Sequence, residues 1–368
     1  MEGEIRNFIA VWITVLASLC YCHTMSKFIP KGTTRLFTIL PIIFLFLYLP
    51  LHLTTIHLGS TTAFFITWLA NFKLLLFAFG KGPLSSNPPL SLPHFLLFSC
   101  LPIKVQHNQA PPNPPKPQKT QNKKYPSPQT PQNSHKSPLN YATKITLLAL
   151  LLQAYGYKEF IHPKIMMVLY GFYIYLSLEL LLVVVAAGAR AAAQLELEPQ
   201  FDEPYLATSL QDFWGKRWNL MVSSIMRPTV YNPVRSISAR AIGRRWAPIP
   251  AIIATFFVSG LMHELIFYYA GRLRPTLEVT CFFLIHGVCL AAEMVAKEAI
   301  KGKFKLPRIV TGPAVMGFVV VTGLWLFLPP VLLFEADVMA KRETVAYVEF
   351  VKKVIRVTNV RWFSAVSR

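Results

Sequence analysis

Long uninterrupted apolar runs are the feature that most limits how this chain of 368 residues can fold. Several windows reach the roughly 20 apolar residues that an α-helix needs to cross a bilayer core of about 30 Å. Hydrophobic residues make up 53% of the chain and charged residues only 15%, outside the usual balance of soluble domains. We therefore predict an all-α, polytopic membrane protein with about eight spans, at 7–22, 36–57, 61–80, 141–157, 165–188, 248–270, 276–298 and 308–334.

Composition divides the chain into segments. Residues 1–103 hold the N-terminal membrane helices, although the apolar run 92–103 is too short to span. Residues 104–140 are rich in Pro, Gln, Asn and Lys and contain no Asp or Glu, which predicts a disordered cytosolic linker. Residues 141–335 form the second membrane region, and residues 336–368 mix Lys and Arg with Val and Phe, as an amphipathic surface helix does.

The net charge of +20 comes mostly from loops between the apolar runs. Basic loops stay in the cytosol, so residues 27–35, 213–247 and 297–308 are predicted to share the cytosolic side. Topology thus explains much of the charge without nucleic acid, while capture of an anionic substrate remains an alternative. Eight crossings would place the basic tail in the lumen, which leaves one span of the count in question.

The sequence lacks the motifs of several known catalytic, metal-binding and nucleotide-binding sites. Five cysteines without a CxxC pair predict neither a disulfide framework nor a zinc ribbon. His263-Glu264 begins like the zinc-protease pattern HExxH, but Phe267 stands where the second histidine is needed. The chain also has no GxSxG elbow, phosphate-binding P-loop or GxGxxG fingerprint, so we expect no metal and no cofactor.

Ionisable residues inside the predicted spans point to a site. His263 and Glu264 lie about 15 residues into the span 248–270, ~22 Å along a helix that rises 1.5 Å per residue. Burial of such groups in lipid is costly, which favours a cavity, although a histidine bonded to a neighbouring helix is the alternative. His286, Cys289 and Glu293 share one face of the next span; this face either lines the chamber or bonds adjacent helices, and packing is favoured for Cys289.

An ordered set of motifs identifies a family resemblance. The set comprises Asn71-Phe72-Lys73-Leu74-Leu75-Leu76-Phe77-Ala78-Phe79-Gly80, Gly82-Pro83-Leu84-Ser85-Ser86, Phe213-Trp214-Gly215-Lys216-Arg217-Trp218-Asn219, Arg227-Pro228-Thr229-Val230-Tyr231 and Ser259-Gly260-Leu261-Met262-His263-Glu264. In this order the motifs resemble the plant wax synthase branch of the membrane-bound O-acyltransferase family. The resemblance covers most of the chain apart from the linker and the tail, and makes residues 141–335 the acyltransferase core.

The resemblance implies that His263 and Asn219 are the catalytic pair. A neutral imidazole can take the proton of an alcohol while its oxygen attacks the thioester of acyl-CoA, the co-substrate. Asn219 would donate to the oxyanion or orient a substrate, which the sequence leaves open. The implied product is a wax ester made from a long-chain fatty alcohol, in the endoplasmic reticulum membrane.

Further substrate-binding candidates surround the pair: Trp214, Lys216, Arg217, Trp218, Arg227, Glu264 and His286. Lys216, Arg217 and Arg227 would hold the phosphates of coenzyme A, since guanidinium groups pair well with phosphate. Trp214 and Trp218 fit the walls of an acyl tunnel or, as the favoured alternative, interfacial anchors.

Other functions remain open at this stage. A sterol or diacylglycerol could be the acceptor with the same residues. A transporter that uses His263, Glu264, His286 and Glu293 as a relay is the rival from a different class, although no internal repeat supports it. A scaffold without catalysis would leave the costly buried charges purely structural.

Overall fold

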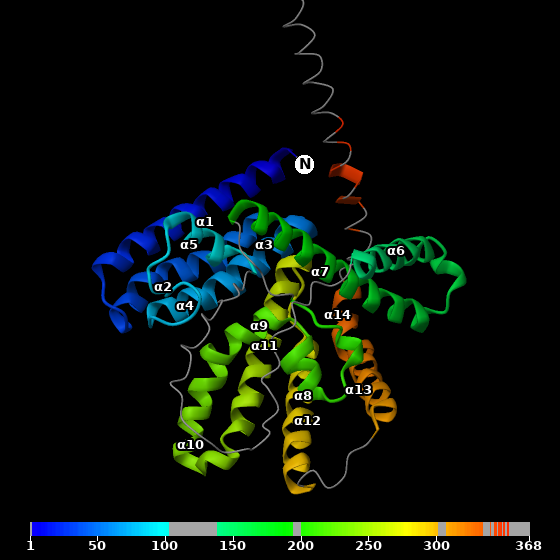
Figure 1. Ribbon diagram of the computed structural model, residues 1–368. Coiled ribbons are helices and arrows are strands. Elements are labelled where there is room, and N and C mark those ends of the chain that lie inside the picture. The colour runs from blue at the N-terminus through cyan, green and yellow to red at the C-terminus, as the bar shows by residue number, and fades with distance from the viewer. Residues whose placement is uncertain are drawn as a thin grey trace, which may run out of the picture. The chain divides into compact units, whose positions relative to one another are not determined.

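The protein is described here by a computed structural model that covers residues 2–102, 138–193, 200–300 and 307–333, together with 339, 342, 343, 345–347, 349 and 352. Over these residues the chain forms helices and turns and no strand (Figure 1). It divides into two compact units, residues 1–103 with 199–368, and residues 104–198. The predicted linker, apart from its last residues, and most of the predicted tail lie outside the described residues.

Seven helical segments are long and apolar enough to cross a membrane, among the residues just given. They are α1 (Glu2–Phe28), Thr33–His52 with α2 (Thr33–Tyr48), Ile56–Ala78 with α3 (Thr61–Ala63) and α4 (Asn71–Ala78), Pro163–Gly188 within α7 (Pro163–Ala193), α11 (Pro248–Gly271), α12 (Glu278–Ile300), and Arg308–Leu333 with α13 (Arg308–Thr322) and α14 (Leu328–Leu333). The prediction of a polytopic helical membrane protein is confirmed.

The predicted span 141–157 is the one that does not meet these criteria. It forms a helix, α6 (Pro138–Tyr155), but Asn140, Lys144 and Gln153 lower its apolar content. Within the second unit, α6 packs against α7, and the Lys144 ammonium lies 2.7 Å from the Glu179 carboxylate with both side chains buried. The two charges therefore compensate each other where neither could be left alone in lipid.

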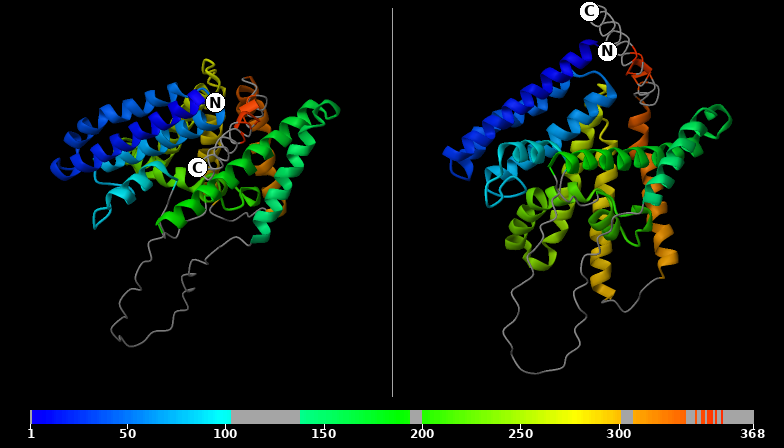
Figure 2. Two further views of the ribbon diagram at one scale, coloured as in Figure 1. Left: turned by 90° about the horizontal axis from the view of Figure 1, so that it is seen from above. Right: turned by 45° about the horizontal axis from the view of Figure 1, so that its top comes forward.

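Shorter helices complete the larger unit: α5 (Leu92–Cys100), α8 (Leu210–Asp212), α9 (Leu220–Met226) and α10 (Asn232–Trp246). In the run predicted as too short to span, the helix α5 has nine residues, as expected. Helices α1 and α2 lie alongside each other in both views of Figure 2.

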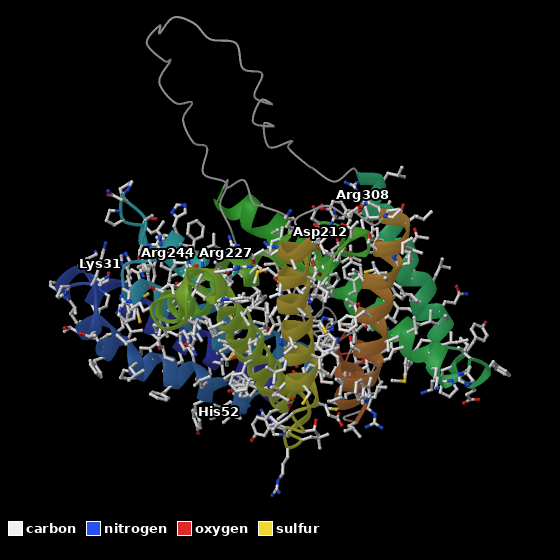
Figure 3. The ribbon with its side chains drawn as sticks, turned by 90° about the horizontal axis from the view of Figure 1, so that it is seen from below. Lys31, His52, Asp212, Arg227, Arg244 and Arg308 are labelled. Carbon is white, nitrogen blue, oxygen red and sulfur yellow. The ribbon has the colours of Figure 1, made fainter. Side chains whose placement is uncertain are left out.

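The larger unit has a basic end. Figure 3 places five labelled residues at one end of this unit and His52 at the other: Lys31, Asp212, Arg227, Arg244 and Arg308. Each of the three loops that the charge pattern assigned to one side thus contributes at least one labelled residue to this end. We call this the basic end.

Glu4, near the N-terminus, and Glu343, from the predicted tail, both contact the opposite end of this unit. The Glu4 carboxylate accepts hydrogen bonds from the N–H groups of Thr54 and Thr55, and the Glu343 carboxylate accepts from those of Ile56 and His57. Both carboxylates therefore contact the segment 54–57, which follows His52 at the end opposite the basic end. Glu343 belongs to the predicted tail, so this residue of the tail lies at the end opposite the basic loops.

The pair α11 and α12 packs unusually closely. A Cβ atom on Gly260 would lie 2.8 Å from the Cα of Thr280, and one on Gly287 would lie 3.0 Å from the Cβ of Phe256. Small residues let two helix backbones approach in a membrane. The Glu264 carboxylate then accepts a hydrogen bond from the Thr280 N–H at 3.1 Å and satisfies a backbone donor in the first turn of α12.

Replacement of Gly260 by alanine should therefore destabilise the protein. The added methyl group meets the Thr280 backbone, and overpacking of this kind costs about 1–3 kcal/mol. The matched control is Gly317→Ala in α13, where an added Cβ meets nothing within 4 Å. The thermal midpoint of the purified protein in detergent should fall for Gly260→Ala and hold or rise for the control; equal midpoints would refute the close contact.

Candidate active site

His263 lies in an aromatic box built from three other parts of the chain. Its ring centroid is 5.0 Å from that of Trp68, 4.5 Å from that of Phe283 and 5.9 Å from that of Phe327. Trp68 comes from the Ile56–Ala78 span, Phe283 from α12 and Phe327 from the turn that precedes α14. We call these three rings the aromatic box. The predicted histidine is thus enclosed by apolar rings on several sides.

One hydrogen bond fixes the state of the His263 ring. Its Nδ1 lies 2.7 Å from the carbonyl oxygen of Ser259, one turn earlier in α11. A carbonyl can only accept, so Nδ1 carries the proton and a neutral ring leaves the lone pair on Nε2 available. Over the described residues, no hydrogen bond engages Nε2. The arrangement presents an unoccupied acceptor inside an apolar box.

His286 is held in the opposite way, with both ring nitrogens occupied. The Trp214 indole N–H donates to Nδ1 at 3.1 Å, and Nε2 lies 2.9 Å from the Thr322 hydroxyl. That hydroxyl donates to the Phe318 carbonyl, so it accepts from the Nε2–H of His286. Of the two alternatives that the sequence left open for this face, the geometry matches the bonding of adjacent elements.

The segment Phe213–Arg217 forms a π-helical turn that carries Trp214 into the helix pair. The Trp214 ring packs 5.4 Å from Phe256 of α11 and 5.7 Å from Phe283 of α12. Phe283 also contacts His263, so Trp214 is one ring removed from it. Trp214 thus uses both its N–H and its ring in contacts inside the protein, and its role as an interfacial anchor or as a wall of an acyl tunnel stays a prediction.

Trp218 directly follows this turn, and its ring packs against two phenylalanine rings. It stacks on Phe213 at 5.5 Å with the planes 16° apart, and Phe201 meets it edge-on at 5.2 Å. Its ring therefore packs within its own loop rather than against the aromatic box.

α12 anchors this loop at a second point. The Glu293 carboxylate accepts the Leu210 N–H at 2.7 Å, and Cys289 packs against the cluster of Leu210, Ile252 and Leu290. The shared face predicted for His286, Cys289 and Glu293 is thus the face that holds the motif loop. The packing role favoured for Cys289 agrees with this position.

Asn219 has a clear role in the backbone. It adopts a left-handed conformation with φ 38°, and its Oδ1 accepts the Val222 N–H at 3.3 Å, which caps α9. Asparagine tolerates this conformation and caps helices better than most residues. No hydrogen bond or ring contact between described residues joins Asn219 to His263. The structure therefore does not bring the predicted pair into direct contact.

Arg217 is tied into the loop that contains it. It donates from Nε to the Asp212 carboxylate at 2.9 Å and from a terminal nitrogen to the Asp202 carbonyl at 3.0 Å. Burial alone raises the pKa of Asp212, but hydrogen bonds from Arg217 and the Thr208 N–H outweigh it and hold that pKa below its ordinary value. The pair therefore stabilises the fold at neutral pH and loses this contribution as the pH falls through the lowered pKa.

The other two cationic candidates are exposed. Lys216 and Arg227 have exposed side chains, and Arg227 lies at the basic end. Glu264, by contrast, is buried, and its carboxylate accepts a hydrogen bond from the first turn of α12. The seven substrate-binding candidates therefore separate into two exposed cations and five residues that hold the fold of the site.

Sequence reasoning missed the residues that touch His263. Trp68, Phe283 and Phe327 are aromatic residues within apolar runs, where they look like any other lipid-facing or packing side chain. Ser259 was quoted only as part of a motif. The one available signal was its place four residues before His263, where its carbonyl can accept from the ring.

Comparisons with known proteins show similarity to membrane acyltransferases. Residues 197–285, which include Trp214, His263 and Phe283, match the profile described as "Membrane bound O-acyl transferase family". The chain is 48% identical to "Acyl-CoA--sterol O-acyltransferase 1" of Arabidopsis thaliana, over 88% of this chain and 90% of that protein. It is 44% identical to "Long-chain-alcohol O-fatty-acyltransferase" of Simmondsia chinensis, over 92% and 93%.

We expect His286→Phe to destabilise the protein, because it leaves the buried Trp214 N–H without its acceptor, while the Thr322 hydroxyl still donates to the Phe318 carbonyl. Each buried polar group left unsatisfied costs about 1–3 kcal/mol. Removal of both members of one bond, in Trp214→Phe with His286→Phe, should cost less than the sum of the single changes. Thermal midpoints of the three variants test this, with exposed His52→Ala as control; strictly additive losses would contradict the bond.

Proposed function

This chain belongs to the membrane-bound O-acyltransferase family, and we propose that it esterifies a long-chain fatty alcohol with the acyl group of acyl-CoA. It is an acyltransferase and a multi-pass membrane protein. The proposal places the reaction inside the membrane, at the aromatic box, and the protein in the endoplasmic reticulum. The observation that carries it is the unoccupied Nε2 of His263.

His263 acts as the general base in this proposal. Its Nε2 accepts the hydroxyl proton of the alcohol as the oxygen forms a bond to the thioester carbon. The C–S bond then breaks, and the imidazolium returns the proton to the departing thiolate of coenzyme A. The bond from Nδ1 to Ser259 supports this role, because it keeps the ring in the tautomer and orientation that leave Nε2 free.

The apolar surroundings of the base fit two apolar substrates. The rings of Trp68, Phe283 and Phe327 offer contacts to hydrocarbon and keep water, a competing nucleophile, away from the thioester. A fatty alcohol and an ester product both partition into lipid, so a site within the bilayer receives one and releases the other directly.

Coenzyme A approaches from the basic end. Lys216 and Arg227 are exposed, and Arg227 lies at that end with Lys31, Arg244 and Arg308. Clustered cations attract a multiply phosphorylated ligand, and basic loops belong on the cytosolic side. Arg217 takes no part in this, because Asp212 and backbone carbonyls occupy it.

Asn219 supplies its amide in the proposal. Its Oδ1 is committed to the Val222 N–H, while no hydrogen bond engages its Nδ2 anywhere in the described part of the chain. The amide N–H groups are therefore available to donate to substrate, at a loop tied to the box through Trp214 and Phe283. Asn219 would thus hold the acyl carbonyl while His263 activates the alcohol.

A sterol is the second candidate acceptor. The identity of 48% to the sterol acyltransferase exceeds the 44% to the long-chain-alcohol enzyme of Simmondsia chinensis. The long-chain-alcohol proteins of Arabidopsis thaliana, at 43% and 42%, lie in the same range. Both acceptors present a single hydroxyl on an apolar body, so the same base would serve either.

We expect microsomes that carry the chain to form wax ester from labelled acyl-CoA and a fatty alcohol, with less product from a sterol or diacylglycerol. Replacement of His263 by alanine should lower the rate ~10²–10⁴-fold, the usual contribution of a general base. Resolution of the lipid products measures both results in one assay.

The control is His52→Ala, a histidine at the opposite end of the same unit with an exposed side chain. The His52→Ala variant should form ester at the same rate as the unsubstituted protein. If sterol ester is the main product, the acceptor is a sterol and not a fatty alcohol. If the His263→Ala enzyme is active at normal abundance, His263 is not the general base. If no acceptor yields an ester, the proposed reaction is wrong.

Two substitutions separate the amide of Asn219 from its backbone role. Asn219→Gly keeps the left-handed conformation, and Asn219→Asp keeps the helix cap, but both lose the amide N–H groups. If the amide contacts substrate, both variants should lose activity about 10²–10³-fold, as on loss of an oxyanion donor. If both keep activity, Asn219 serves only the loop backbone.

A further inference from the structure

The Ile56–Ala78 span is the most enclosed of the candidate spans. In its most apolar window 83% of residues are buried, against 22–44% in the others among the described residues. Trp68 lies near the middle of this span, within the π-helical turn Phe64–Ala70, and is 2% exposed. π-Helical turns are rare and occur frequently at functional sites. Nothing in the sequence motifs assigns this residue a role in the reaction.

The indole N–H of Trp68 finds no hydrogen-bond partner among the residues that the structure describes. Its Nε1 is buried and unpaired among the described residues. Two other indoles show the usual outcome, since Trp12 donates to the Thr62 hydroxyl at 3.3 Å and Trp214 donates to His286. Buried donors are almost always paired, so an unpaired one in a native interior requires an explanation.

The neighbours of Trp68 are aromatic rings. Phe64 meets it at 5.6 Å and His263 at 5.0 Å, both nearly perpendicular to the indole. A ring face is only a weak acceptor for an N–H group. The strongest candidate acceptor is therefore one that arrives with the substrate, and the ring in contact with Trp68 is the proposed base itself.

We propose that Trp68 contacts the substrate, with its indole N–H donating a hydrogen bond to the carbonyl oxygen of the acyl thioester. This rests on the proposed function of His263. As the alcohol oxygen bonds to the carbonyl carbon, negative charge gathers on the carbonyl oxygen, and a donor fixed in a dry site stabilises that charge. Trp68 and the Asn219 amide would then be two donors to one oxyanion.

Indole suits this place better than other donors do. A lysine or arginine would bring a full charge into the bilayer at high cost. A serine, threonine or tyrosine hydroxyl beside a general base would compete with the alcohol for the acyl group. The indole N–H cannot act as an acceptor, and its apolar body fills the box.

The test compares Trp68→Phe with Trp12→Phe in purified protein in lipid nanodiscs. Trp68→Phe keeps an aromatic ring and removes the donor, so kcat should fall ~10²–10³-fold, as on loss of one oxyanion donor. KM for acyl-CoA and the thermal midpoint should change little, because the lost N–H had no partner in the folded protein. Trp12→Phe should keep kcat. A Trp68→Phe enzyme with normal kcat overturns the proposal.

A spectroscopic measurement does not depend on the Trp68 variant folding. Acyl-CoA labelled with ¹³C at the carbonyl, bound to His263→Ala protein that cannot turn it over, should show a carbonyl stretch at lower wavenumber than the free thioester. An unshifted band overturns the proposal. Where Trp68→Phe folds, its addition should return the band towards the free value, and an unchanged band again overturns it.

The two proposals fail in distinguishable ways. If His263→Ala is fully active, the proposed base is wrong whatever Trp68 does. If His263→Ala is inactive while Trp68→Phe keeps its kcat, the base stands and only the assignment of Trp68 falls.

Discussion

The close contact between α11 and α12 is the constraint on which the site depends. Gly260 against Thr280 and Gly287 against Phe256 bring the two backbones together, and Glu264 satisfies the first turn of α12. Only at this separation can Phe283 of one helix lie against His263 of the other, at 4.5 Å. Lipid gives no hydrophobic drive for helix association, so close packing and hydrogen bonds must supply it.

Two histidines on this helix pair illustrate how hydrogen bonds decide the use of one side-chain type. His286 has both nitrogens engaged, and it holds Trp214 to α12 while Thr322 accepts its second proton. His263 has one nitrogen engaged by a carbonyl of its own helix and the other left available. The first organises the loop that carries Asn219; the second is equipped for proton transfer.

Two further cations donate hydrogen bonds to carbonyl groups at helix ends. The fully buried Lys73 donates to the carbonyls of Phe98 and Leu101 at the end of α5, both at 2.6 Å. Arg272, at the end of α11, donates to the carbonyl of Leu53 at 2.7 Å. Helix C-termini leave carbonyls without partners, so these cations satisfy groups that lipid would not. Such charges stabilise the arrangement of the helices around the site.

The sequence by itself determined the helical membrane class and most spans, and it offered His263 as a candidate, because apolar length and costly buried groups are local properties. It offered His286 and Trp214 as candidates but not their bond, and it gave no sign of Trp68 or Phe327. Only the tertiary structure decided these, since an aromatic residue in an apolar run looks the same wherever it points. Which ring meets His263 depends on how closely the helices pack, and Gly260 permits that close approach.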